Sequence, residues 1–393
     1  MKIPKGFKSI GVACNIKKKD KLDLALIVSD APCSGAGFFT KNKFAAAPIQ
    51  ICRKRLSNAS PRAIIANSGC ANACTGKRGL SDAEQTALLV SKAIGCKKQE
   101  VLVASTGVIG AFLPMDKIEQ GIKNATANLS ENDWLSAARA IMTTDTVPKI
   151  ASLNLEINGC PVTFLGMAKG AGMIHPNMAT MLSFIITDAN VSPSALKKAG
   201  RIAVNRSFNC VTVDGDTSTN DTVLYLANGM AENKRISPNS GDYKIFESAL
   251  TEISQSLARQ IAADGEGATK LIEVRVIGAK TEKDAHKTAN AVATSNLVKT
   301  AIFGKDANWG RIVCAIGYSG ADFDPDKITV HIGDELIFSK GAPQVKSEER
   351  LNKILEGREI PISIDLKSGA ASSTVWTCDF SCDYVKINAD YRT

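Results

Sequence analysis

Short apolar runs bounded by polar turns alternate along this chain with segments in which apolar residues recur at helical spacing. Runs rich in Leu, Ile, Val and Ala are typical of buried strands, and they occur at 22–29, 62–66, 100–104 and 271–276. The run from Met181 to Ile186 is also rich in β-favouring residues. It therefore predicts a further buried strand.

Helices are predicted where apolar residues repeat every three or four positions. Ser81–Glu84 has the form of a capping box, so we expect a helix that begins there and ends at Gly95. Further helices are expected from Pro114 and from Ser192-Pro193, because proline is favoured in the first turn. A long amphipathic helix is expected at about 243–262.

A β-hairpin and a strand-rich C-terminal part complete the pattern. Residues 151–157 and 162–167 flank Asn158-Gly159, a pair that suits a type I′ turn. Near the C-terminus a short helix is expected at 347–355, among several strands. These strands are predicted at 327–332, 335–338, 359–365, 373–377 and 384–387. Strands and helices in mixed order predict an α+β fold of mixed α/β layers, with sheets sandwiched by helices and a smaller C-terminal lobe.

Composition and charge exclude several classes of function. The net charge of +9 comes from scattered basic residues, and aromatic residues make up only 5%, which disfavours nucleic acid as a partner. No apolar run approaches the roughly 20 residues that cross a bilayer, and the first residues lack the apolar core of a signal peptide, so we expect a cytoplasmic protein and no membrane contact.

Metal and cofactor motifs are also absent from the sequence. The eleven cysteines are spread out, their two close pairs have C-x3-C spacing, and the three histidines do not cluster with them, so we expect reduced thiols and no metal. The sequence contains no G-x-S-x-G, Walker, H-E-x-x-H or dinucleotide motif. A Ser-His-Asp triad and a nicotinamide or ATP enzyme are therefore disfavoured.

Ala179-Thr180 is the most suggestive pair, because it places a hydroxyl at the start of the Met181–Ile186 strand. A threonine there can attack the carbonyl before it, cut the chain and become an N-terminus with its own amine beside the hydroxyl. Threonine with an N-terminal amine is a known activated nucleophile. The alternative is that Thr180 is only a β-favouring residue that starts a strand, and the local pattern taken alone favours this alternative.

Other polar loops follow strands or helices, and each has a functional and a plain interpretation. Thr106-Gly107 could hold an oxyanion or could be a strand-exit turn. Thr143–Thr146 could contact a ligand or cap a helix. Lys169 could bind a carboxylate or lie on the surface, and Glu266 could bind an ammonium group or be solvated. Taken one at a time, each of these residues fits the plain interpretation better, but their joint occurrence with Ala179-Thr180 counts against it.

Eight motifs, in this order, resemble those of the ornithine acetyltransferases, also called the bifunctional glutamate N-acetyltransferases of arginine biosynthesis. They cover the chain nearly end to end, and the central one, which ends in Ala-Thr-Met-Leu, is the most specific. The motifs are Asn67–Ala73, Ser105–Gly110, Met142–Thr146, Lys169–Ile174, Asn177–Leu182, Asn220–Thr222, Gly265–Lys270 and Asn388–Thr393.

The resemblance implies self-cleavage between Ala179 and Thr180. The products would be fragments 1–179 and 180–393, the second with a lobe at roughly 280–393, and the fragments would stay associated, with two copies of each. Thr180 would be the nucleophile, and Thr106 and Gly107 would form the oxyanion hole. The implied substrate contacts are Thr143, Lys169, Thr180, Glu266, Asn388 and Thr393.

The implied reaction is a ping-pong transfer in which Thr180 takes the acetyl group of N-acetylornithine and passes it to L-glutamate. The α-amine on Thr180, with a reference pKa of about 7.7–8.0, would act as general base, so no cofactor is required. By charge, Lys169 is assigned to the substrate α-carboxylate and Glu266 to an ornithine amine, an assignment that could be exchanged.

Three points stay open at this stage. Acetyl-CoA is a second acetyl donor in some members of this family and not in others. A self-activating N-terminal-threonine amidohydrolase or aminopeptidase on the same scaffold is the first rival function. The second rival is a non-catalytic binding protein in which Thr180 is structural.

Overall fold

The computed structural model describes residues 2–17, 20–175, 181–345 and 347–390. Its first sheet has four strands in the order β1-β2-β4-β5 and is antiparallel except for the parallel β4–β5 pair. The strands are β1 (Phe7–Val12), β2 (Leu24–Ser29), β4 (Ala63–Cys70) and β5 (Val101–Val108). The helices that pack with them are α1 (Ala47–Leu56), α2 (Gly76–Ile94), α3 (Met115–Ala127) and α4 (Trp134–Ala140).

The second sheet has five strands in the order β3-β9-β8-β7-β6. They are β3 (Ser34–Phe39), β6 (Lys149–Ile157), β7 (Cys160–Lys169), β8 (Leu182–Thr187) and β9 (Thr222–Ala227). The middle strands, β8 and β9, follow residue 180 in the sequence, whereas the flanking strands β3 and β7 precede it. Helices α5 (Pro193–Asn205) and α6 (Tyr243–Ala263) pack on this sheet.

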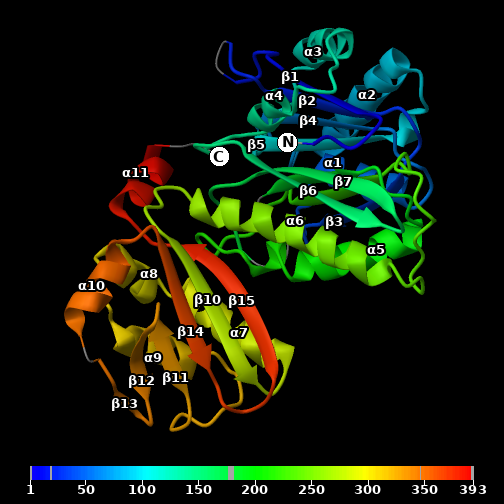
Figure 1. Ribbon diagram of the computed structural model, residues 1–393. Coiled ribbons are helices and arrows are strands. Elements are labelled where there is room, and N and C mark those ends of the chain that lie inside the picture. Colours follow the sequence, from blue (N-terminus) through cyan, green and yellow to red (C-terminus); the bar gives the residue numbers. More distant parts are fainter. Residues whose placement is uncertain (1, 18–19, 176–180, 346, 391–393) are drawn as a thin grey trace.

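Alternation along the strands of the second sheet divides its side chains between two cores. On β7, Phe164 faces the core that α5 and α6 complete, whereas Leu165 belongs to the core shared with the first sheet. On β8, Ile185 and Phe184 divide in the same way. The two sheets therefore stack with an apolar layer between them, and helices cover the outside (Figure 1).

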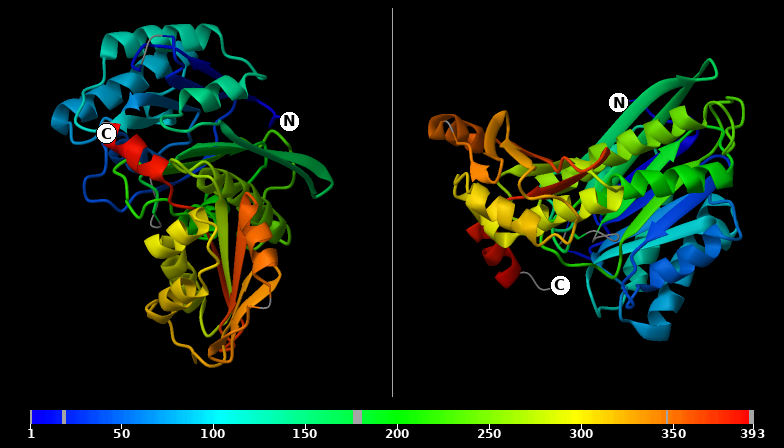
Figure 2. Two further views of the ribbon diagram at one scale, coloured as in Figure 1. Left: turned by 90° about the vertical axis from the view of Figure 1, so that its left-hand side faces the viewer. Right: turned by 90° about the horizontal axis from the view of Figure 1, so that it is seen from below.

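A third, six-stranded sheet forms a smaller C-terminal lobe, which projects from the two-sheet part (Figure 2). Its strands are β10 (Leu271–Ala279), β11 (Thr329–Ile332), β12 (Glu335–Ser339), β13 (Ala342–Pro343), β14 (Glu359–Asp365) and β15 (Ala371–Cys378). The helices are α7 (Glu282–Thr294), α8 (Asn296–Phe303), α9 (Trp309–Gly317) and α10 (Glu348–Glu356). The predicted mixed α/β layers with a smaller lobe are thus confirmed.

Two local predictions were wrong. The segment 384–387, predicted as a strand, lies inside helix α11 (Cys382–Asp390), because so short a segment with Tyr, Val and Ile fits either state and its flanks continue the helix. Ser81–Glu84 does not start a helix, since α2 already begins at Gly76. The hairpin turn is confirmed, with positive φ at both Asn158 and Gly159.

No helix among the described residues is long and apolar enough to cross a membrane.

Helix α11 lies at the left of Figure 1, between the two-sheet part and the C-terminal lobe. Its residues Tyr384 and Asn388, four positions apart, share one face, and both line the pocket described next.

Candidate active site

A pocket of about 130 Å³ collects residues from segments that are distant in the sequence. Six of the predicted site residues line it, namely Thr106, Gly107, Thr143, Lys169, Glu266 and Asn388. Thr180, Ala179 and Thr393 lie outside the described residues. The remaining lining residues are Ala71, Ile109, Thr144, Gly172, Met173, Asp214, Asp216, Ser218, Thr219, Asn220 and Tyr384.

Thr106 and Gly107 lie near the end of β5, where the strand runs beside β4. Gly107 has φ +129°, and a Cβ there would lie 2.4 Å from the carbonyl carbon of Gly69. Only glycine fits this close approach of the two strands. The Lys169 ammonium donates to Thr106 Oγ over 3.3 Å, which leaves the hydroxyl hydrogen of Thr106 free to donate elsewhere.

Lys169 is the last residue of β7 and is 2% exposed. Burial lowers its pKa, because the charged form loses its hydration. The carboxylates of Asp145, Glu266 and Asp221 oppose this shift. The pocket thus holds a desolvated amine whose charge depends on nearby acids.

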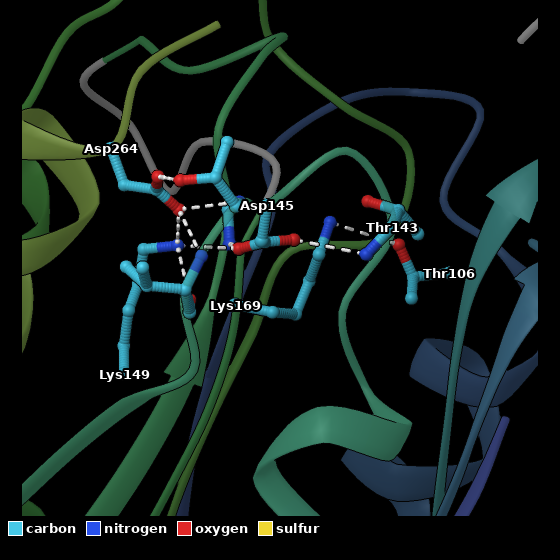
Figure 3. A network of polar contacts seen from close by, with 9 residues as sticks. Thr106, Thr143, Asp145, Lys149, Lys169 and Asp264 are labelled. Atoms are coloured by element: carbon cyan, nitrogen blue, oxygen red, sulfur yellow. Dashed lines mark hydrogen bonds and ion pairs between the residues drawn. The ribbon is translucent and has the colours of Figure 1, made fainter. Parts of the chain in front are cut away.

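Three charged side chains, Asp145, Lys149 and Asp264, form a buried cluster behind Lys169 (Figure 3), which we call the Asp145 cluster. Lys149 Nζ lies 2.6 Å from Asp145 Oδ1 and 2.5 Å from Asp264 Oδ2. Burial alone raises the pKa of Asp145, but the charges of Lys169 and Lys149 outweigh this effect, and the pKa falls to about 2. Asp145 is therefore ionised throughout the physiological range.

Glu266 occupies the loop after α6 and contacts the C-terminal helix. Asn388 Nδ2 donates to Glu266 Oε2 over 2.9 Å, and the Glu266 backbone N–H donates to Ala171 O over 2.8 Å. A Cβ at Gly172 would lie 2.3 Å from Glu266 Oε2, so Gly172 makes room for this carboxylate. Gly172 of the Lys169–Ile174 motif thus has a steric purpose.

Comparison with known proteins identifies the family. The family model described as the ArgJ family matches residues 8–393. The chain belongs to the ArgJ family. The arginine biosynthesis bifunctional protein ArgJ of Symbiobacterium thermophilum is 52% identical over 392 residues, which cover 99% of this chain and 98% of that protein. The protein of the same name from Caldanaerobacter subterraneus is 49% identical and covers 100% of this chain and 98% of its own length.

A crystal structure of the arginine biosynthesis bifunctional protein ArgJ from Bacillus halodurans has 46% sequence identity and a TM-score of 0.51 to this chain. The match covers 52% of this chain and 96% of that chain. The matched ArgJ chain is thus about half as long as the chain described here. Membership of the family, predicted from the motifs, is confirmed.

Some residues around the pocket of this ArgJ family member had no predicted role. Asn220 Nδ2 donates to Ala71 O and to Ser105 O, both over 2.7 Å, and so ties the first sheet to the second. Asp221 is fully buried, its Oδ1 accepts the Met181 N–H over 3.2 Å, and burial raises its pKa well above the usual value. Both residues lie in the matched motif Asn220–Thr222, and this motif is the sequence feature that could have pointed to them.

Proposed function

We propose that the chain transfers an acetyl group from N-acetylornithine to L-glutamate through an acetyl ester on Thr180. Membership of the ArgJ family makes the chain an acyltransferase of arginine biosynthesis, as the sequence predicted. It also decides against the hydrolase and the non-catalytic binding protein. The observation that carries the proposal is the convergence of Thr106, Gly107, Lys169 and Glu266 on one pocket.

In the first half-reaction the Thr180 amine accepts the hydroxyl proton, and Thr180 Oγ attacks the acetyl carbonyl. The Gly107 N–H and the Thr106 hydroxyl donate to the oxyanion, and the contact in which Lys169 donates to Thr106 is compatible with this role, because it uses the hydroxyl only as an acceptor. The carbon–nitrogen bond then breaks, and the proton leaves with the ornithine amine. In the second half-reaction the glutamate amine attacks the ester, and Thr180 regains its hydroxyl hydrogen.

Charge complementarity orients the substrate. The buried Lys169 pairs with the α-carboxylate, and Glu266 pairs with an ornithine amine. Thr143 and Asn388 line the same pocket and supply neutral hydrogen-bonding groups. Thr393 is proposed as a further contact from the resemblance alone.

We further propose that Thr180 becomes an N-terminus by cleavage after Ala179, and that the enzyme contains two copies of each fragment in the cytoplasm. The half-length chain of the Bacillus halodurans relative supports cleavage. No cofactor is proposed. The word bifunctional in the names of the relatives supports acetyl-CoA as a second donor.

The decisive assay supplies purified protein with glutamate and either N-acetylornithine or acetyl-CoA as the only donor. Formation of N-acetylglutamate with equimolar ornithine from the first donor is expected, and formation from the second donor is expected if the chain is bifunctional. Release of free acetate without N-acetylglutamate would contradict the transfer.

Gly107→Ala tests the oxyanion hole. The new methyl group would collide with the Gly69 backbone and strain a positive φ, so we expect a loss of about 1–3 kcal/mol in the free energy of unfolding. Displacement of the N–H should lower kcat by about 100-fold. Gly110→Ala is the matched control, because φ is +84° there and a Cβ would meet nothing within 4 Å. Equal kcat values for the two variants would contradict the assignment.

A further inference from the structure

The Asp145 cluster connects three segments that deliver substrate-binding residues to the pocket (Figure 3). Asp145 Oδ2 accepts the Thr143 N–H over 2.9 Å, and its Oδ1 accepts the Gly170 N–H over 2.6 Å. Asp264 accepts the Thr146 N–H over 3.1 Å and lies two residues before Glu266. One buried ionic network therefore fixes the segments of Thr143, Lys169 and Glu266 relative to one another.

Within the Asp145 cluster two carboxylates face one ammonium, and Lys169 is the cation outside the cluster that acts most strongly on Asp145. Asp145 and Asp264 carry two negative charges, and both contact the single ammonium of Lys149. An unbalanced charge in a buried site is costly, and the charge of the buried Lys169 side chain offsets part of that of Asp145. The contact between Asp145 and the Lys169 segment runs through the Gly170 N–H.

Resting on the function proposed above, we propose that Asp145 is a positioning residue for acetyl transfer. Its carboxylate fixes the Thr143 and Gly170 backbones against each other and keeps the Lys169 side chain cationic where the substrate carboxylate binds. Asp145 is not among the described residues that line the pocket, and its carboxylate contacts the Thr143 N–H, the Lys149 ammonium and the Gly170 N–H.

Several other charges act on Lys169 and enter the pH argument. Lys149 and Lys17 are the neighbouring cations, and Glu266 and Asp221 are the other acids. The Asp145 charge raises the pKa of Lys169, so its removal lowers that pKa. A group with a lowered pKa loses its proton at lower pH, and the Lys169 ammonium would then be lost earlier as the pH rises.

The test is Asp145→Asn in the full chain, which removes the charge and keeps the shape. After cleavage is checked on a denaturing gel, kcat and KM for N-acetylornithine are measured against pH. We expect KM to rise at least about 10-fold, because the substrate contacts are displaced, and the alkaline limb of kcat/KM to move to lower pH.

Asp188→Asn is the matched control. Asp188 is also buried and accepts two backbone N–H groups, from Lys5 and Thr163, but it follows the far end of β8. If Asp145→Asn and Asp188→Asn lose similar stability and both keep the wild-type KM and alkaline limb, the positioning role is refuted. Absence of transfer in the wild type would instead refute the proposed function.

If Asp145→Asn does not fold, Lys169→Arg provides a second test of the inference. Guanidinium stays charged across the accessible pH range, so the alkaline limb that Lys169 sets in the wild type should disappear from whatever activity remains. An unchanged alkaline limb in Lys169→Arg would overturn the inference, because the limb would then belong to another group.

Discussion

A Thr180→Ala chain is expected to remain in one piece and to form no N-acetylglutamate from N-acetylornithine. Without the hydroxyl there is nothing to attack the Ala179 carbonyl and nothing to carry the acetyl group. Loss of a catalytic nucleophile lowers kcat by about 10⁴-fold or more in enzymes that act through one. Intact mass and a denaturing gel report cleavage, and product formation reports transfer.

Two controls make the Thr180→Ala result specific. Thr180→Ser keeps a hydroxyl and should retain cleavage and a reduced rate. Thr187→Ala removes a buried threonine from the opposite end of β8 and should leave cleavage unchanged. A Thr180→Ala chain that still divides between residues 179 and 180 would show that the nucleophile is misassigned.

Lys169→Met is expected to have the next largest effect, with kcat/KM for N-acetylornithine lower by about 30- to 5,000-fold. This range corresponds to the 2–5 kcal/mol lost when one partner of a buried charge pair is removed. The substrate carboxylate would enter a pocket that still contains Asp214, Asp216 and Glu266. Steady-state kinetics with N-acetylornithine measures the effect.

Lys270→Met provides the matched control for Lys169→Met. Lys270 is also buried, at 7% exposed, and its Nζ donates to Gly357 O, away from the pocket lining. Its replacement should lower stability without a comparable loss of kcat/KM. Similar kinetic losses in the two variants would mean that Lys169 acts only through folding.

The strands that the sequence predicted correctly are those with a strong local pattern. β2, β5 and β8 are apolar over several residues and fully buried, or nearly so, whatever packs on them. β3 was not predicted, because its sequence SGAGFF has little strand character. Its glycines are explained by packing, since a Cβ at Gly35 or Gly37 would collide with Leu56. The sequence of β3 alone does not indicate that Leu56 packs against these glycines.

The candidate site was likewise predictable only in part. The resemblance singled out Thr106, Lys169 and Glu266, although each local pattern taken alone fitted a surface loop. What could not be predicted is the convergence of these segments, because it depends on contacts such as Lys149 with Asp264, which are 115 residues apart. Asp145 lay in a matched motif, but its role depends on those long-range neighbours.

The strand order of the second sheet determines how many chains must come together when the protein folds. Strands β8 and β9 lie between β3 and β7, so a cut after residue 179 leaves the two fragments interleaved within one sheet. Uncut protein folds as a single molecule, whereas the cut protein can reassemble only by an encounter of two chains. Its apparent stability then depends on concentration. Self-cleavage would therefore convert a first-order folding reaction into a second-order one, and dilution after unfolding would favour separated fragments.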